Sequence, residues 1–182
     1  MSKVLGVVGS PRKNGNTDVL VTKILEGVQL TNGETEKILL NELLIRECDG
    51  CHICWRNKPC NKNDDMNHLY DKIIKSDVIL FGTPVYWYGP TALMKIFIDR
   101  FVYFNCPEHR SKIKGKKAVL VIPYEEQNLE TVEPVLTFFE KSLQYLEIKI
   151  IGKIIVPGVT KKGEVLRKIK TIDSCIHLGK HL

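Results

Sequence analysis

Residues 3–17, KVLGVVGSPRKNGNT, join a short apolar run to a polar loop. The run from Lys3 to Gly9 is rich in β-branched side chains and closes on glycine, which predicts a buried strand. The segment that follows, residues 17–30, has four apolar side chains with the spacing of one helix face: Val21, Ile24, Leu25 and Val28. The polar loop therefore connects a predicted strand to a predicted helix.

The alternation of strands and helices continues along the whole chain. Further apolar runs predict strands at residues 36–40, 78–82, 117–122 and 148–156. Helices are predicted at residues 64–75, 90–101 and 129–146, with a last helix in the tail. Near-continuous apolar strands that alternate with helices are typical of parallel strands buried on both faces. The predicted fold class is α/β, a flavodoxin-like three-layer sandwich with a five-stranded parallel sheet of order 2-1-3-4-5.

Composition agrees with one globular domain. The chain has 182 residues, of which 43% are hydrophobic and 26% charged. No apolar run approaches the roughly 18 residues of a membrane span, and the first residues turn polar too soon for a secretory signal. We expect a single cytoplasmic domain over residues 1–182, without membrane contact, and with a cysteine-rich loop inserted at about residues 41–63.

The net charge of +6 is concentrated in two segments. Residues 109–117 carry five Lys or Arg and no acid, and residues 161–182 carry a net +4, which leaves −3 on the remaining chain. Neither segment interleaves aromatic side chains with basic ones, as a nucleic-acid stacking platform does. A solvated loop and a solvated helix face are favoured, so we expect no nucleic-acid partner.

Hydroxyl, amide and guanidinium groups fill the loop after the first strand, residues 9–17. They precede a helix N-terminus, where free backbone N–H groups and the helix dipole favour a phosphate. A Walker A loop is excluded because Asn16 stands where that motif has lysine, and the fingerprint G-x-G-x-x-G is absent. The alternative is a plain N-cap at Asn16 or Thr17. The arginine and the length of the loop favour the phosphate site.

Three successive aromatic residues, Tyr86, Trp87 and Tyr88, lie between two prolines in the loop after the third strand. In a sheet of the predicted order, ligands bind at the carboxyl ends of the strands, near the switch between the first and third strands. The two loops are therefore predicted to share a site. The aromatic side chains either bind a planar heterocycle or end the strand as core or interface residues.

Together, GSPRKNGNT (residues 9–17) and TPVYWYGPTALMKIFIDRF (residues 83–101) resemble the NAD(P)H-dependent FMN reductase and iron-sulfur flavoprotein group of flavodoxin-like proteins. The resemblance covers most of the chain and implies an FMN-binding domain. It implies that the FMN phosphate is held by Ser10, Arg12, Asn14, Asn16 and Thr17. It implies that the isoalloxazine is lined by Pro84, Val85, Tyr86 and Trp87. By the same resemblance, Asp99 and Arg100 orient the helix or a dimer contact.

One loop departs from that resemblance. After the fourth predicted strand, residues 123–126 read PYEE, where the group often has small or glycine-rich residues. No flavin contact is therefore assigned to this third loop.

Four of the six cysteines, Cys48, Cys51, Cys54 and Cys60, form the pattern C-x2-C-x2-C-x5-C. In a reducing compartment such a group is more often a metal or redox site than a set of disulfides. Three thiolates at this spacing can each reach a different iron of a cubane, and a fourth completes the ligation. Zinc sites more often use two well-separated C-x2-C pairs. A 4Fe–4S cluster is favoured over zinc and over unligated thiols, and the spacing also resembles that of iron-sulfur flavoproteins.

The residues and the resemblance together predict an FMN-dependent oxidoreductase that passes electrons from a reduced donor, such as NAD(P)H or ferredoxin, to a small-molecule acceptor through an adjacent 4Fe–4S cluster. No side chain is assigned as a catalytic acid or base, because the cofactors carry the chemistry. A reductase without iron, and a flavin-binding carrier or regulatory module without turnover, remain alternatives. The resemblance implies a homodimer or homotetramer in which the cysteine loop of one subunit approaches the flavin of another.

Overall fold

A parallel sheet of five strands forms the centre of the computed structural model, which describes residues 2–182. Its strands are β1 (Lys3–Val8), β2 (Glu34–Leu39), β3 (Val78–Gly82), β6 (Lys117–Pro123) and β7 (Lys149–Val156). Their order across the sheet is β2-β1-β3-β6-β7, and every neighbouring pair is parallel. Counted among the sheet strands alone, this is the predicted order 2-1-3-4-5, so the predicted fold is confirmed.

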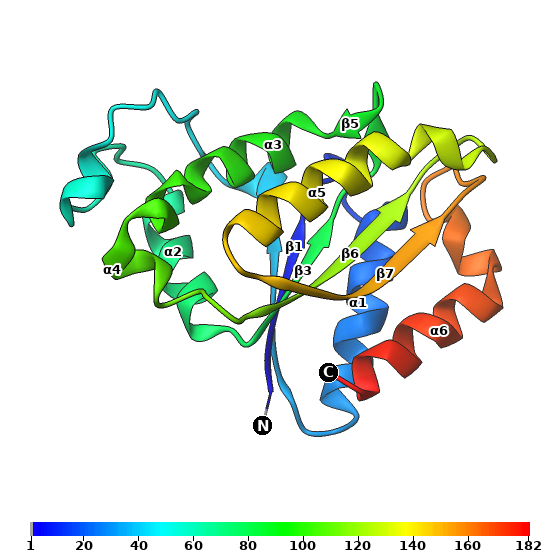
Figure 1. Cartoon of the computed structure of the whole chain (residues 1–182). Helices are drawn as coiled ribbons and strands as arrows, with labels where there is room; N and C mark the ends of the chain where they lie inside the picture. Colours follow the sequence, from blue (N-terminus) through cyan, green and yellow to red (C-terminus); the bar gives the residue numbers. More distant parts are fainter. Residues whose placement is uncertain (1) are drawn as a thin grey trace.

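Helices cover both faces of this sheet (Figure 1). On one face lie α1 (Asn16–Gln29) and α6 (Ile169–Lys180), and on the other lie α2 (Met66–Lys75), α3 (Ala92–Asp99) and α5 (Glu133–Tyr145). The short helix α4 (Pro107–Arg110) follows the 3₁₀ helix Arg100–Asn105. Within the described residues, no helix is long and apolar enough to cross a membrane.

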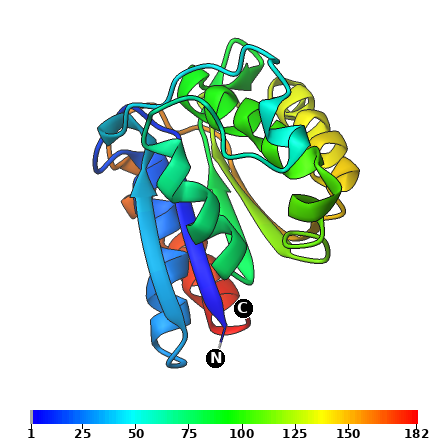
Figure 2. The same cartoon turned by 90° about the vertical axis from the view of Figure 1, so that its left-hand side faces the viewer.

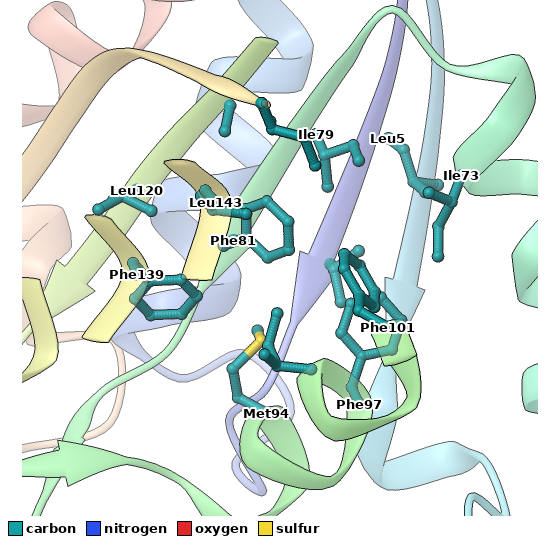
Figure 3. Packing of buried hydrophobic residues seen from close by; sticks show 14 of the residues in the cluster. Leu5, Ile73, Ile79, Phe81, Met94, Phe97, Phe101, Leu120, Phe139 and Leu143 are labelled. Atoms are coloured by element: carbon teal, nitrogen blue, oxygen red, sulfur yellow. The ribbon is translucent and has the colours of Figure 1, made fainter. Parts of the chain in front are cut away.

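The alternation of side chains along each strand divides the core into two layers. From β1, Val4 and Val8 pack toward α1, whereas Leu5 and Val7 pack toward α2 and α3. The larger layer is aromatic (Figure 3), with Phe81, Phe97, Phe101 and Phe139 in contact from four different elements. The three central strands, β1, β3 and β6, are thus buried on both faces, which explains why they are continuous apolar runs, whereas the edge strands β2 and β7 are partly exposed.

Two glycines allow α1 and α6 to cross closely. A methyl group on Gly27 would lie 2.2 Å from the carbonyl oxygen of Ile176, and one on Gly179 would lie 2.0 Å from that of Ile24. No side chain fits at either position because the obstructing atoms belong to the backbone. This crossing fixes the C-terminal helix against the helix that begins at the first polar loop.

The prediction that Pro90 begins the third helix is wrong. Pro90 belongs to a small antiparallel hairpin of β4 (Val85–Tyr86) and β5 (Gly89–Pro90), in which it pairs with Val85. The helix begins after Thr91, whose hydroxyl accepts a hydrogen bond from the Met94 N–H and donates one to the Gly9 carbonyl at 2.5 Å. Thr91 therefore caps α3 and ties it to the end of β1.

The cysteine-rich segment, residues 41–63, is largely irregular, as expected, but includes the 3₁₀ helix Ile53–Arg56 and overlaps another, Leu40–Glu42. Figures 1 and 2 show it in cyan, extending from the sheet on the side of α2, α3 and α4. It is anchored there by Trp55, whose indole N–H donates to the Val102 carbonyl at 3.1 Å.

Candidate functional site

A pocket opens at the carboxyl edge of the sheet, where the loops after β1, β3, β6 and β7 meet. It encloses about 520 Å³ including its open mouth. Its lining residues are Ser10, Arg12, Asn16, Thr17, Pro84, Val85, Tyr86, Pro123, Tyr124, Glu125, Val159 and Thr160. Most of the predicted flavin contacts are thus gathered in one pocket at the edge where ligands of such sheets bind.

Two predicted contacts do not line this pocket. Asn14 lies at an exposed turn with a left-handed backbone (φ 56°), and its N–H donates to the Asp18 carboxylate at 2.8 Å. Trp87 lies at the tip of the β4–β5 hairpin with 97% of its surface exposed. Asn14 shapes the first loop, and Trp87 is held away from the pocket wall.

The N-terminus of α1 forms the polar end of the pocket. The helix is capped by Gly15 without a side-chain hydrogen bond, so neither Asn16 nor Thr17 acts as the cap. The first N–H groups of a helix have no partner within it, and here they lie beside Ser10, Thr17 and the exposed guanidinium of Arg12. Backbone donors, hydroxyls and a cation at one helix end suit a phosphate group.

Residues 159–165, which we call the C-terminal strap, close this polar end and were not predicted from the sequence. Arg12 Nη1 donates to the Thr160 carbonyl at 3.0 Å, and the Val165 N–H donates to Asn16 Oδ1 at 3.1 Å. The Glu164 carboxylate accepts hydrogen bonds from the N–H groups of Lys161 and Thr160, and these lower the pKa of Glu164. The strap thus orients two of the predicted phosphate contacts.

The hairpin beside the pocket holds its aromatic tip in a strained conformation. Trp87 and Tyr88 are the two turn residues, and both have positive φ angles, 49° and 59°. This matches a type I′ turn, which normally takes Asn or Gly because a side chain in this region costs about 1–2 kcal/mol per residue. Tyr86 alone of the three aromatic residues lines the pocket.

A second pocket lies in the cysteine-rich segment. It encloses about 370 Å³, and all four predicted ligands, Cys48, Cys51, Cys54 and Cys60, line it. Burial raises the pKa of the Cys54 thiol, and the nearby Cys60, Cys48 and Cys51 raise it further. The four thiols therefore share one site, and each would stabilise a cation placed among them.

Arg100 lies beneath this pocket with 1% of its surface exposed. Its Nη2 donates to Cys60 Sγ at 3.2 Å, while its Nη1 donates to Asp64 Oδ2 at 2.5 Å and to the Arg46 carbonyl at 2.9 Å. The Tyr70 hydroxyl donates to the Arg100 carbonyl. Arg100 therefore joins the two ends of the cysteine segment and places a positive charge against one thiol.

Asp64 and Asp65, which precede α2, also connect the two ends of the cysteine-rich segment. Asp64 accepts the Arg46 N–H at 2.9 Å, and Asp65 accepts the Leu44 N–H at 2.7 Å. Nearer the pocket, Asp49 pairs with Lys62 at 2.7 Å. These contacts connect the entry and exit of the segment, so the loop is closed independently of its cysteines.

Four cysteine side chains around one pocket are a donor set that an iron-sulfur cluster can use. Among the described residues, no group of three or more His, Cys, Asp or Glu side chains is arranged to hold one metal ion. A single zinc ion requires its sulfur ligands about 2.3 Å from one centre. In a 4Fe–4S cubane each thiolate binds a different iron, so the ligands stand farther apart around the rim of a pocket. All four cysteines line one cavity.

Helix α3 separates the two pockets. Its capping residue Thr91 bonds to Gly9 at the first pocket, and Arg100, just beyond its last residue, lines the second. Eight helical residues span about 12 Å. Figure 1 shows α3 extending from β5 toward the cysteine-rich segment. The two pockets of one chain are thus placed at opposite ends of this helix.

The chain is similar in sequence to known proteins. A family model described as NADPH-dependent FMN reductase matches residues 2–150. An iron-sulfur flavoprotein of Archaeoglobus fulgidus is 32% identical over 178 residues, covering 96% of this chain and 78% of the relative. Another from the same organism is 38% identical over 185 residues, covering 99% and 91%.

Solved structures support the same fold. An NAD(P)H:quinone oxidoreductase from Methanothermobacter marburgensis superposes with a TM-score of 0.74 at 15% identity, covering 99% of this chain and 94% of that one. A flavodoxin from the domain Archaea gives a TM-score of 0.59 at 12% identity, covering 100% and 95%. At these identities the likeness concerns the fold.

The fold and the matching family define an FMN-dependent oxidoreductase of the flavodoxin-like class. The chain belongs to the NADPH-dependent FMN reductase family. The C-terminal strap lies beyond residue 150, where the family match ends, although Val159 and Thr160 line the first pocket.

Proposed function

We propose that this protein transfers electrons from a reduced nicotinamide nucleotide through FMN in the first pocket and a 4Fe–4S cluster in the second to a small-molecule acceptor. A reduced ferredoxin is an alternative donor. The observation that carries the proposal is the gathering of all four cysteines of the C-x2-C-x2-C-x5-C pattern around one pocket. The names of the archaeal relatives, iron-sulfur flavoproteins, support the cluster.

In the first pocket, the N-terminus of α1 with Ser10, Arg12, Asn16 and Thr17 binds the FMN phosphate. Asn14 acts on this site through the turn that Asp18 holds. Thr17 and Ser10 are buried, and the strap holds Arg12 and Asn16 in place, so the binding groups are ordered before the ligand arrives. Pro84, Val85 and Tyr86 form the wall against which the isoalloxazine packs, and Trp87 at the hairpin tip is exposed for a contact outside this pocket.

In the second pocket, Cys48, Cys51, Cys54 and Cys60 ligate the cluster. A 4Fe–4S cluster exchanges single electrons, and a flavin exchanges one or two, so the pair connects two-electron donors to one-electron steps. Arg100 offsets negative charge at Cys60 and excludes water from beneath the pocket. Such hydrogen bonds to cluster sulfur raise the reduction potential.

We propose a homodimer or homotetramer in which the cysteine segment of one subunit lies against the first pocket of another. The exposed residues Trp87, Tyr88 and Trp55, on the hairpin and the cysteine segment, offer apolar surface for this contact. Sedimentation of the reconstituted protein at low micromolar concentration tests the assembly; a monomer under these conditions would contradict it.

The cluster is tested by reconstitution with iron and sulfide under anaerobic conditions. The single variants Cys48→Ser, Cys51→Ser, Cys54→Ser and Cys60→Ser are each expected to lose most of the iron and the visible absorption of the cluster while they retain FMN. Cys106→Ser is the matched control, because Cys106 donates to Glu108 outside the pocket and serine can do the same. Full iron content in all four variants would contradict the proposed ligands.

A reductase without iron is the competing function. It predicts that the wild-type chain binds FMN and oxidises NADPH with an added acceptor, yet retains no iron or sulfide after reconstitution. A flavin-binding carrier predicts FMN binding without turnover by any nicotinamide donor. Both alternatives leave the first pocket unchanged, so the cysteine variants and the turnover assay separate them from the proposed function.

A further inference from the structure

The hydroxyl of Tyr124 is buried and has no hydrogen-bond partner. Among residues 2–182 it is the one buried side-chain nitrogen or oxygen atom without a hydrogen-bond partner. The side chain is 2% exposed, so solvent does not supply the missing partner freely. A buried polar atom left unpaired costs free energy, and native proteins retain one chiefly where a ligand, ion or ordered water pairs with it.

The backbone around Tyr124 is held on both sides. Its N–H donates to the Val156 carbonyl at 2.9 Å, and its carbonyl accepts the Val159 N–H at 3.0 Å. The next turn is fixed as well, because the Gly158 N–H donates to the Glu126 carbonyl at 3.2 Å. The backbone of Tyr124 is therefore held between the ends of β6 and β7 before any ligand binds, whereas its hydroxyl has no partner.

Tyr124 lies in the wall of the first pocket. It lines the pocket together with Pro84, Val85 and Tyr86, the residues against which the flavin ring is proposed to pack. Burial raises the pKa of Tyr124, and Glu126 raises it further, so the hydroxyl keeps its proton at neutral pH and can donate. A flavin ring carries carbonyl oxygens and ring nitrogens that accept hydrogen bonds, which is the partner that the hydroxyl lacks.

We propose that the Tyr124 hydroxyl, which water does not reach while the pocket is empty, turns into the pocket when the flavin ring binds and donates a hydrogen bond to an acceptor atom of the ring, so that the loop after β6 contributes a positioning residue to the flavin site. This inference rests on the proposed binding of FMN in the first pocket. Because the ring gains negative charge on reduction, a donor at this place stabilises the reduced form more than the oxidised form. Tyr124 thus positions the ring and raises the reduction potential of the flavin.

The test compares Tyr124→Phe with Arg12→Ala, each titrated with FMN and with riboflavin, which has the same ring but no phosphate. Tyr124→Phe is expected to lower the affinity for FMN and the affinity for riboflavin by about the same factor, roughly fivefold. This is the effect of losing one ordinary hydrogen bond. Arg12→Ala is expected to lower the affinity for FMN and to leave the affinity for riboflavin unchanged. Tyr124→Phe is further expected to lower the midpoint potential of bound FMN.

Thermal unfolding of the flavin-free protein distinguishes a purely structural role of Tyr124 from a contact with the flavin. Removing an unpaired hydroxyl leaves the packing of the ring intact, so the thermal midpoint of apo Tyr124→Phe is expected to equal or exceed that of the wild type. A lowered apo midpoint would overturn the proposal, because the hydroxyl would then have a partner within the chain.

The remaining outcomes are equally decisive. Unchanged affinity of Tyr124→Phe for both ligands, or weakened affinity for FMN alone, would overturn the contact with the ring. If Arg12→Ala still weakens FMN, the proposed pocket stands and only the role of Tyr124 falls. If neither variant changes FMN binding, the proposed pocket itself is wrong.

Discussion

Arg100 donates a hydrogen bond to the sulfur of Cys60 at 3.2 Å, from a guanidinium that is almost fully buried. The same guanidinium is paired with Asp64 at 2.5 Å, with neither side chain more than 1% exposed. The charged guanidinium of Arg100, at the C-terminal end of α3, thus contacts one of the four cysteines of the pattern. Hydrogen bonds pull the pKa of the Asp64 carboxyl down against the opposing effect of its burial, so this carboxylate is ionised beside Arg100.

Loss of this buried pair is expected to destabilise the apo protein strongly. Arg100→Met leaves the Asp64 carboxylate buried without its partner, and we expect the free energy of unfolding in urea to fall by about 3–5 kcal/mol. Lys95→Met removes the exposed pair between Lys95 and Asp99 and is the control, with a loss below about 1 kcal/mol. Equal losses in the two variants would show that Arg100 is not held as described.

The helix crossing at Gly27 is expected to tolerate no side chain. Gly27→Ala places a methyl group against the Ile176 carbonyl, and we expect a net loss of about 1–3 kcal/mol as α1 and α6 move apart. In Gly152→Ala the new methyl group would lie 3.4 Å from the flexible Leu178 side chain, so a change below about 1 kcal/mol is expected. Thermal unfolding of the two variants gives the comparison, and similar midpoints would contradict the close crossing.

Cys175 is expected to resist alkylation. Burial raises the pKa of Cys175 to about 12, so at pH 8 almost none of it is thiolate, the reactive form. Because the pKa is higher in the folded state than in the unfolded state, the neutral thiol contributes stability below about pH 9, and this contribution is lost as the pH rises toward 12. Iodoacetamide labelling followed by mass spectrometry is expected to modify exposed Cys51 first in the apo protein. Early labelling of Cys175 would contradict its burial.

The C-terminal strap is expected to support FMN binding in a pH-dependent way. Glu164→Ala removes the acceptor for the N–H groups of Lys161 and Thr160, so the strap loosens from Arg12 and FMN affinity falls. In the wild type the pKa of Glu164 is lowered, so its contribution is present above about pH 4.5 and lost as the pH falls through the folded-state pKa. Asp173→Ala, at an exposed position on α6, is the control. FMN titrations that rank the two variants equally would argue against the role of the strap.

The sheet could be predicted from the sequence chiefly because its central strands, β1, β3 and β6, are buried on both faces. An apolar run such as Val78–Gly82 predicts a strand without any knowledge of the neighbouring strands. The predicted order of the strands then places the loops that follow them at one edge of the sheet. The hairpin at Val85–Pro90 was missed because Trp87 and Tyr88 occupy turn positions that Asn or Gly would normally mark. Pro90 therefore predicted the start of a helix, although it lies in the hairpin and the helix begins at Ala92.

Some residues of the candidate sites could be predicted from a local sequence pattern, and others could not. The first loop and the cysteine pattern were recognisable because their chemistry is local in the sequence. The contribution of Thr160, about 150 residues from the first loop, and that of Tyr124 depend on chain crossings that no local pattern records. The expectation that Arg100 orients a helix or a dimer contact stays a prediction, and its hydrogen bond to Cys60 was not predicted, because it depends on the end of α3 meeting the cysteine segment.

The central claim is that one chain holds a flavin and an iron-sulfur cluster in two separate pockets. Quantifying FMN, iron and acid-labile sulfide in anaerobically reconstituted wild-type protein tests it most directly. We predict one FMN with about four irons and four sulfides per chain, and loss of the iron but not the flavin in Cys60→Ser. A protein that binds one FMN per chain and retains no iron or sulfide would contradict it.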